Sequence, residues 1–294
     1  LLEIRPAQKD EIEIQKNLWK KSFGDEDRYI DLYFRYKYQA DRTMLLFKDN
    51  NLASMLTMFP LYVSTPDNEK FKAAMFYGIA TDPQYQGYGF ATKLINFCND
   101  FLAKQNIPLT LLVPASKNLF GFYYKLGYRA NFYLRENVLT SDFINRPATH
   151  ADYECSIVPA SPEEYNSRRE ELLEGKLHVA YLAEDIFYQK RLSQASGADI
   201  FTVDFADACG CVVVERANPL KVVIKELLVP EYYLPTVLKK IISMLPSVEY
   251  VVRTPCFINQ PGENIFKPFG MLRCNDMDLA KSLEDSGYLG LAFD

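Results

Sequence analysis

The chain has 294 residues, more than one hydrophobic core usually needs, so its length favours two folding units of about 150 residues each. Its 33 basic and 38 acidic residues give a formal net charge of -5 with no long run of either sign, which argues against nucleic acid as a main partner. No stretch approaches the roughly 20 apolar residues of a membrane span, and the first residues lack a signal-peptide layout. We therefore expect no membrane partner and a cytoplasmic location.

Cysteine and histidine usage argues against metal and nucleophile chemistry. The six cysteines lie in apolar or strand-like segments, so we interpret them as small buried side chains in a reducing compartment. Cys209 and Cys211 do not have the spacing of a zinc knuckle, and the only histidines, His150 and His178, lie far from them in the sequence. We expect no metal site and no catalytic pair of serine or cysteine with histidine.

The first half of the chain has the pattern of a mixed α/β domain. Apolar spacing and turn residues predict a strand at residues 2–5, helices at 9–23 and 26–38, a hairpin of 43–48 and 52–60, a strand at 72–81, a helix at 91–105, a strand at 109–113, a helix at 118–125 and a last strand after residue 128. The strand at 72–81, a glycine loop and the helix at 91–105 follow one another directly.

A polar, proline-interrupted stretch at residues 145–152 is the predicted linker between two domains. Beyond it the order of elements repeats that of the first half, with helices at 162–173 and 182–194, strands at 200–205, 211–215 and 222–229, a helix at 234–245 and a strand at 248–253. We therefore expect one domain at residues 1–144 and a second at residues 153–294.

The glycine loop is a candidate phosphate-binding site. Residues 86–91, Gln-Gly-Tyr-Gly-Phe-Ala, stand at the start of the predicted helix. Backbone N–H groups at a helix start bind phosphates well, because the helix dipole favours negative charge and small residues allow close approach. Two glycines before a helix also suit an ordinary strand-to-helix turn, so the neighbouring segments decide between the two interpretations.

Two segments resemble the signatures of the GNAT superfamily of N-acetyltransferases. Residues 79–94 are similar to its central signature, Gln/Arg-x-x-Gly-x-Gly/Ala after a strand, with Gln86, Gly89 and Ala91 in the three defined places. Residues 122–128, Phe-Tyr-Tyr-Lys-Leu-Gly-Tyr, resemble the second signature, Phe-Tyr-Glu-Lys-Leu-Gly-Phe. The resemblance implies a mixed-sheet α/β fold and an acetyltransferase that uses acetyl-CoA.

The resemblance also implies roles for individual residues. Loop N–H groups would bind the pyrophosphate of coenzyme A, and the preceding strand would pair with the pantetheine arm as an added strand does. Ser116 falls where many members carry an asparagine near the thioester. The pyrophosphate residues are then Gln86, Gly87, Tyr88, Gly89, Phe90, Ala91 and Thr92, and the pantetheine residues are Ile79 and Thr81.

Tyr123 falls where many such enzymes hold a tyrosine that protonates the departing thiolate, so it is the predicted general acid. The alternative is a tyrosine that only packs in the core.

The general base is not found on the strand before the glycine loop, because residues 74–81 contain no carboxylate. Residues 114–118 and the two-domain layout resemble the enhanced-intracellular-survival branch, although the chain is too short for its third, sterol-carrier-like domain. In that branch a C-terminal carboxylate acts as base, which implies this role for Asp294. The last residues also fit a final strand or a docking segment.

The second half resembles a degenerate copy of the first. No glycine falls between Gly210 and Gly262, so the segment in the place of the glycine loop does not suit a pyrophosphate. Residues 265–271 resemble an eroded second signature, with Phe266 in the place of the tyrosine. We expect tandem GNAT-like domains, of which the second binds no cofactor of its own and closes the substrate pocket of the first.

These patterns predict acetyl transfer from acetyl-CoA to a primary amine of a small molecule or peptide. An acidic chain with 20 tyrosines suits a cationic amine. Two alternatives stay open. One is an acyl-CoA-binding pseudoenzyme or sensor, which the missing strand carboxylate suits. The other is an aminoacyl-tRNA-dependent transferase on a related paired fold, which should show a basic face.

Overall fold

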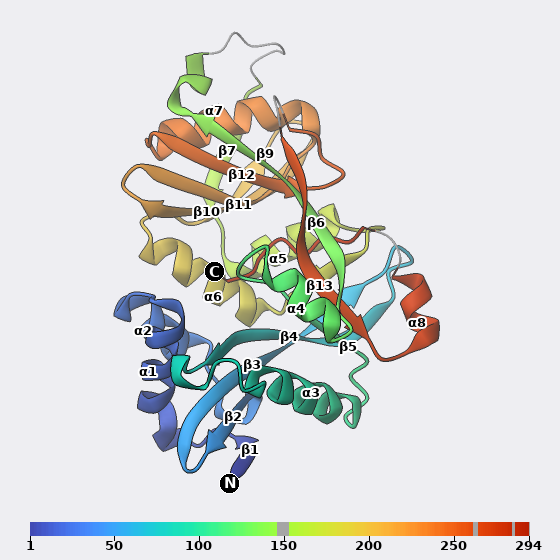
Figure 1. Ribbon diagram of the computed structural model, residues 1–294. Coiled ribbons are helices and arrows are strands. Elements are labelled where there is room, and N and C mark those ends of the chain that lie inside the picture. The colour runs from blue at the N-terminus through green and yellow to red at the C-terminus, as the bar shows by residue number, and fades with distance from the viewer. Residues whose placement is uncertain (146–152, 261–263, 284–285, 294) are drawn as a thin grey trace. The chain divides into compact units, whose positions relative to one another are not determined.

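The computed structural model describes residues 1–145, 153–260, 264–283 and 286–293, and its helices and strands form a mixed α/β fold (Figure 1), which confirms the expected fold class. The chain divides into two units. Unit 1 is made of Leu1–Val63, Lys70–Ala130 and Gly270–Glu284, and unit 2 is made of Ser64–Glu69, Asn131–Phe269 and Asp285–Asp294. Both units therefore take residues from both halves of the chain. Apart from Asn145, the expected linker at residues 145–152 lies outside the described residues.

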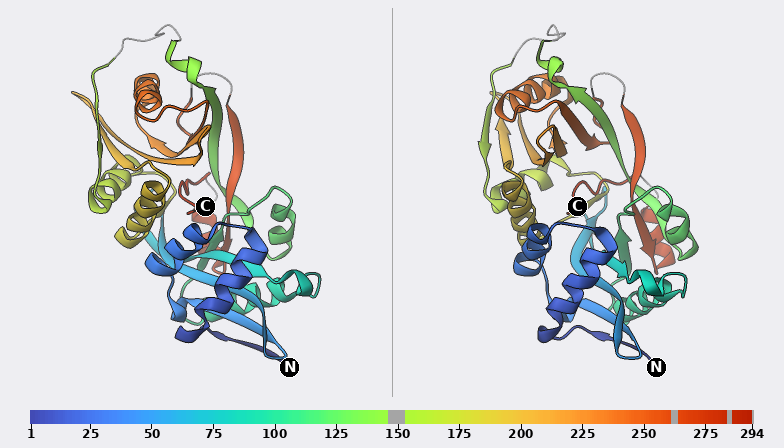
Figure 2. Two further views of the ribbon diagram at one scale, coloured as in Figure 1. Left: turned by 90° about the vertical axis from the view of Figure 1, so that its left-hand side faces the viewer. Right: turned by 60° about the vertical axis from the view of Figure 1, so that its left-hand side comes forward.

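Unit 1 is a mixed sheet with helices on both faces (Figure 2). Its strand order is β1-β2-β3-β4-β5-β13, in which β4 and β5 are parallel and β13 pairs antiparallel with β5. Its elements are β1 (Leu2–Pro6), α1 (Ile12–Phe23), α2 (Asp27–Tyr36), β2 (Thr43–Lys48), β3 (Asn51–Ser64), β4 (Lys70–Thr81), α3 (Phe90–Ala103), β5 (Leu109–Leu112), α4 (Leu119–Lys125), the end of β13 (Ile265–Cys274) and α8 (Met277–Ser282).

Alternating side chains of β4 pack on opposite sides of the unit 1 sheet. Phe76 belongs to the core that contains Leu94 and Ile95 of α3. The next residue, Tyr77, contacts the rings of Trp19 on α1, at 5.7 Å, and Tyr33 on α2, at 5.6 Å. Successive side chains of a strand point to opposite faces, so α3 covers one face and the pair α1 and α2 covers the other.

Strand β4 leaves its partner β5 before it ends. The parallel register runs from Ala73 opposite Leu109 to Met75 opposite Leu111, whereas β4 continues to Thr81. In the part of β4 that is not paired with β5, Gly78 has a φ of +58°. A Cβ added there would lie 3.0 Å from the Trp19 ring. Glycine is favoured at this kink because other residues are strained at positive φ and the tryptophan ring would have to shift to admit a Cβ.

A buried polar cluster joins α3 to β5 and to the start of β6 (Arg129–Thr140). The Asn99 Oδ1 atom accepts a hydrogen bond from the Thr110 hydroxyl at 2.7 Å and another from the Tyr128 hydroxyl at 3.2 Å. Buried polar groups of this kind stabilise a fold only while they are paired. The cluster therefore fixes α3, the helix that follows the glycine loop, against the sheet.

We expect Thr110→Val to lower the free energy of unfolding by about 1–2 kcal/mol, because the change removes one donor to the buried Asn99 oxygen. Urea-induced unfolding followed by circular dichroism measures the loss. Thr110→Ser, which keeps the hydroxyl, is the control and should lose less. A loss in Thr110→Ser without a loss in Thr110→Val, which keeps the methyl, would show that packing of the threonine methyl, and not the hydrogen bond, provides the stability.

Unit 2 repeats the element order of unit 1, and its strands lie in the order β7-β9-β10-β11-β12-β6. Strands β11 and β12 are parallel, as β4 and β5 are. Its elements are β6, β7 (Ser156–Pro159), α5 (Pro162–Leu172), β8 (His178–Ala180), α6 (Ala183–Ala195), β9 (Ile200–Asp204), β10 (Cys209–Asn218), β11 (Lys221–Leu228), α7 (Leu234–Met244), β12 (Glu249–Pro255) and the start of β13. Helices α5 and α6 lie on one face of the sheet and α7 lies on the other (Figure 2).

The expected second signature at residues 265–271 is wrong as local structure. In unit 1 this signature forms α4 and the turn into β6, whereas residues 265–271 belong to the continuous strand β13. The reason is pairing with a distant segment, since Met271 lies opposite Leu112 of β5. Phe266 is half exposed and stacks on Tyr133 with ring centroids 5.2 Å apart, whereas Tyr123 is buried in the core of unit 1. The two residues therefore do not occupy equivalent environments.

Two general features bear on function. In the part of the chain that the structure describes, no helix is both long enough and apolar enough to cross a membrane. The same residues contain no group of three or more histidine, cysteine, aspartate or glutamate side chains that could hold a metal ion.

Candidate functional site

Asp82 fixes the entrance to the glycine loop. One of its carboxylate oxygens accepts the Gln84 N–H at 3.1 Å and the other accepts the Lys21 ammonium at 3.0 Å. Burial alone would raise the pKa of Asp82, but these two hydrogen bonds hold it below its usual value. The charged carboxylate thereby closes the 3₁₀ turn Pro83–Tyr85 at the end of β4.

The two loop glycines adopt backbone conformations that other residues rarely take. Gly87 has a φ of +84° and Gly89 has a φ of +74°. Gly89 is the residue immediately before α3, and its carbonyl accepts the first bond of that helix, from the Lys93 N–H at 3.0 Å. A Cβ at either glycine would meet no atom within 4 Å, so both open onto free space. The glycines are needed for their left-handed backbone and not for internal packing.

The loop also presents unsatisfied N–H donors. The first N–H groups of a helix have no intrahelical acceptor, and here they belong to Phe90, Ala91 and Thr92. Among the described residues, the N–H groups of Gly87 and Gly89 make no backbone hydrogen bond either. Together with the positive end of the α3 dipole, these donors form a site suited to an anion.

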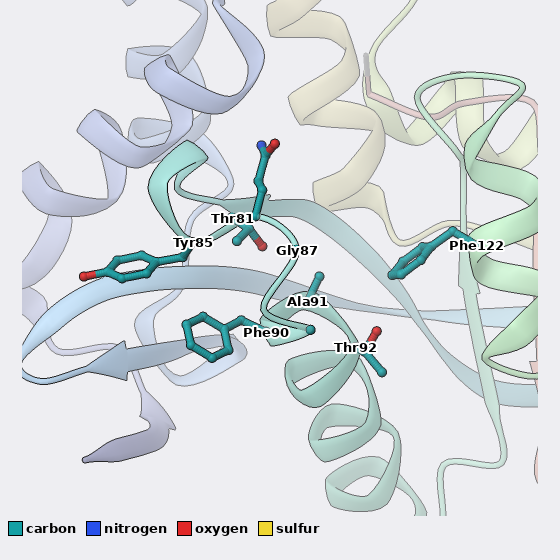
Figure 3. Close-up of a pocket in the computed structure, with 9 residues that line it drawn as sticks. Thr81, Tyr85, Gly87, Phe90, Ala91, Thr92 and Phe122 are labelled. Carbon is teal, nitrogen blue, oxygen red and sulfur yellow. The ribbon is translucent and has the colours of Figure 1, made fainter.

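A cavity of about 330 Å³ opens at this point (Figure 3). Its lining consists of Thr81, Tyr85, Gln86, Gly87, Gly89, Phe90, Ala91, Thr92 and Phe122. All of these except Tyr85 and Phe122 are among the residues predicted for coenzyme A. Those two aromatic side chains lie on opposite sides of the loop (Figure 3). Phe122 is the first residue of the second signature, and this position in the sequence could have been used to predict that it lines the site.

Three other predicted cofactor residues do not line this cavity. Ile79 is half-buried on β4, Tyr88 is 67% exposed at the tip of the loop, and Ser116 is exposed before α4. The carbonyl of Ser116 accepts the Leu119 N–H at 3.1 Å, so its backbone helps to begin α4. The predicted base, Asp294, lies outside the described residues. The roles given to these residues stay predictions.

Tyr123 follows Phe122 in α4 and is 6% exposed. Its ring packs edge-on against Phe122 at 5.0 Å and Tyr128 at 6.1 Å, and it belongs to the α3 side of the unit 1 core. Burial raises the pKa of the Tyr123 hydroxyl to about 12. At neutral pH this hydroxyl is therefore fully protonated and able to donate.

The other face of β4 carries a group of aromatic rings from α1, α2 and β3. The Tyr77 hydroxyl lies 2.8 Å from that of Tyr29, and the Tyr77 ring stacks on Phe59 at 4.8 Å. The ammonium group of Lys37 sits 4.5 Å above the centre of the Phe59 ring. Aromatic faces attract cations, and here one already holds an alkylammonium group.

The corresponding loop of unit 2 lacks these features. In the place of a glycine at the helix start, Tyr233 precedes α7 and Pro235 lies in its first turn. The Tyr233 ring stacks on Phe205 with centroids 3.7 Å apart and packs against Tyr153 and Tyr232. Aromatic side chains thus pack at this helix start, whereas two glycines precede the helix start in unit 1.

The chain was compared with protein families and solved structures. Residues 3–130 match the family model described as an acetyltransferase (GNAT) domain. No curated protein matches the sequence. A GCN5-related N-acetyltransferase from Anabaena variabilis has a similar structure, with a TM-score of 0.74 and 14% identity over 94% of this chain and 73% of the other.

Two further solved structures are similar. Eis1 from Mycobacterium abscessus has a TM-score of 0.69 and 13% identity over 95% of this chain and 75% of the other. A GCN5-related N-acetyltransferase from Kribbella flavida has a TM-score of 0.68 and 12% identity over 94% of this chain and 72% of the other. At such low identity these structures show a common fold.

Proposed function

We propose that the protein transfers an acetyl group from acetyl-CoA to a primary amine of a small molecule or peptide, because residues 3–130 match the family model of an acetyltransferase (GNAT) domain. The observation that carries the proposal is the pair of left-handed glycines, Gly87 and Gly89, which line an open cavity at the start of α3 and whose N–H groups make no backbone hydrogen bond among the described residues. A pyrophosphate suits this arrangement of donors and charge.

The unpaired part of β4 supports binding of the rest of the donor. Beyond Met75 the strand has no register with β5, and its last residues, Ile79 to Thr81, lead to the cavity. A pantetheine arm carries amide groups that can pair with such a strand edge. We assign Ile79 and Thr81 to this pairing, which directs the thioester toward the kink at Gly78.

In the reaction, the amine nitrogen attacks the thioester carbonyl, the carbon–sulfur bond breaks and the sulfur leaves as a thiolate that needs a proton. We assign the proton donation to Tyr123, whose raised pKa keeps the hydroxyl protonated at neutral pH. The amine must also lose a proton. Residues 74–81 provide no carboxylate for that step, so we assign it to the carboxylate of Asp294.

The aromatic group on the other face of β4 favours a cationic acceptor. Tyr77 adjoins Gly78, and the ammonium of Lys37 already lies over Phe59 in the same group of rings. An acceptor with an alkylammonium arm would gain about 0.5–2 kcal/mol from each such face. Polyamines, aminoglycosides and lysine-like groups have this chemistry.

The test is release of free thiol from acetyl-CoA over a panel of spermidine, tobramycin, lysine methyl ester and a lysine-containing peptide, beside calorimetric titration with acetyl-CoA. We expect saturable binding, and thiol release that depends on the amine. Tight binding without turnover of any amine would instead favour an acyl-CoA sensor, the alternative that the missing carboxylate on residues 74–81 supports. Absence of binding would contradict both functions.

A further inference from the structure

The strand of unit 2 that corresponds to β4 carries a carboxylate at the place of Tyr77. The parallel register of β4 with β5 ends at Met75, and that of β11 with β12 ends at Ile224. Two residues further on stand Tyr77 in unit 1 and Glu226 in unit 2. Tyr77 faces α1 and α2, and Glu226 accepts the hydroxyl of Tyr165 on α5 at 2.6 Å, so both side chains point to the face covered by the first two helices of their unit.

Glu226 forms a fully buried ion pair with Arg169 of α5. The Arg169 Nε lies 3.0 Å from one carboxylate oxygen and 3.1 Å from the other, and both side chains are 0% exposed. Burial alone would lower the pKa of Arg169, but the charge of Glu226 raises it above its usual value. Two buried charges are tolerated when each remaining donor and acceptor is also paired. The remaining donors of Arg169 therefore indicate what this site binds.

Those donors are directed at backbone carbonyls. Arg169 Nη1 donates to the Val179 carbonyl at 2.8 Å, and Nη2 donates to the Leu289 carbonyl at 3.1 Å. The Tyr181 hydroxyl lies 3.0 Å from the Leu289 carbonyl and 2.6 Å from the Leu291 carbonyl. Two side chains of unit 2 thus hold the main chain of the segment at Leu289 and Leu291.

Strand-like hydrogen bonds hold the start of the same segment. The Tyr288 N–H donates to Leu177 at 2.8 Å, and the Tyr288 carbonyl accepts the Val179 N–H at 2.9 Å, beside β8. The Gly287 N–H donates to Asn131 at 2.8 Å, at the edge of β6. This is the pattern by which an extended peptide is bound when it adds to strand edges.

Gly290 makes the fit specific. Its φ is +81°, and a Cβ added there would overlap the Glu226 carboxylate and lie 3.0 Å from the Tyr288 ring. The flanking residues Leu289 and Leu291 are fully buried. The site therefore accepts glycine between two leucines, and any larger residue at the centre would clash with Glu226.

We propose that unit 2 is a peptide receptor, whose site of Arg169, Tyr181 and Glu226 binds a Tyr-Leu-Gly-Leu backbone that turns at Gly290, where the Leu291 N–H donates to the Leu289 carbonyl at 3.1 Å, and that this site is filled by the chain's own residues 287–293. A tethered segment has an effective concentration of about 1 mM, so a free peptide of micromolar affinity does not displace it at micromolar concentration. This inference goes beyond acetyl transfer and does not depend on it.

The test uses the full chain and two measurements that need no acetyl-CoA. Hydrogen–deuterium exchange reports whether residues 286–293 are bound, and fluorescence anisotropy reports whether the labelled peptide Gly-Tyr-Leu-Gly-Leu-Ala-Phe binds. In the unsubstituted protein we expect slow exchange in the segment and no peptide binding. In Gly290→Ala we expect at least about tenfold faster exchange in the segment and saturable peptide binding, while β10 and β11 keep their protection. The peptide with alanine at its central glycine should not bind.

Tyr181→Phe tests the same idea without adding a methyl group. It removes the hydroxyl that holds Leu289 and Leu291 and should accelerate exchange of the segment about tenfold. Tyr250→Phe, which removes another buried hydroxyl of unit 2 away from the segment, is the matched control and should leave the segment protected. The proposal fails if exchange rises equally in β10, β11 and the segment, if neither Gly290→Ala nor Tyr181→Phe changes it, or if the peptide does not bind to the opened protein.

Discussion

Replacing Tyr123 by phenylalanine will lower kcat by about 10²-fold and leave the affinity for acetyl-CoA nearly unchanged. The ring stays in its place between Phe122 and Tyr128, so the core is preserved and only the proton donor is lost. Thiol release with the fastest amine of the panel measures kcat, and calorimetric titration measures the affinity.

The pH dependence of the unsubstituted enzyme provides a second measurement. Burial raises the pKa of Tyr123 to about 12, so the donor form is present at every pH below that value, whereas an ordinary tyrosine would begin to lose its proton near pH 10. We therefore expect no loss of kcat from this group between pH 7 and about pH 10. A fall in kcat that begins within this range, as the pH rises, belongs to another residue.

The control for Tyr123 is Tyr124→Phe in the same helix. Tyr124 is 57% exposed, and its ring, which the substitution keeps, packs under the guanidinium of Arg129 at 3.9 Å. Its kcat should stay within about a factor of two of the original value. If Tyr123→Phe behaves like Tyr124→Phe, then Tyr123 is a packing residue, and the proton comes from water or another group.

Replacing Gly89 by valine will weaken acetyl-CoA binding by about 10²-fold or more. A β-branched residue at a φ of +74° is strained by about 1–2 kcal/mol, and its side chain would enter the space into which the loop N–H groups point. Calorimetric titration measures the affinity, and urea-induced unfolding measures the stability.

Gly24→Val is the matched control for the loop. Gly24 ends α1 with a φ of +73°, and a Cβ there would also meet no atom within 4 Å, so the backbone strain is the same but the cavity is not involved. Both variants should lose similar stability, and only Gly89→Val should lose affinity. An equal loss of affinity in the two variants would falsify the assignment of the loop to the cofactor.

The sequence predicts those parts of the molecule that depend on local signals. Gly87 and Gly89 predict the turn and the start of α3, because left-handed backbone before a helix requires glycine. Alternating apolar residues predict β4 and β11 to within about two residues. The seven residues of α4 are also predicted from local spacing.

What the sequence does not predict depends on distant pairing. Nothing near Met271 indicates that it lies opposite Leu112, so residues 265–271 resemble a signature until the strand β13 is seen. The pairing of Arg169 with Glu226 has no signal either, because a buried ion pair looks like two surface charges in a sequence. Tyr85 joins the cavity only because the turn closed by Asp82 brings its ring beside the loop.

The pairing of β5 with Met271 to Cys274 has a consequence for biosynthesis. Strand β5 leaves the ribosome long before residues 271–274 are synthesised. The nascent unit 1 sheet therefore has one unpaired edge through most of translation. Closing that edge joins segments far apart in the chain, which makes it a slow, late step of folding. A fragment that stops at residue 144 would keep this edge for good, and we expect it to aggregate where the full chain folds.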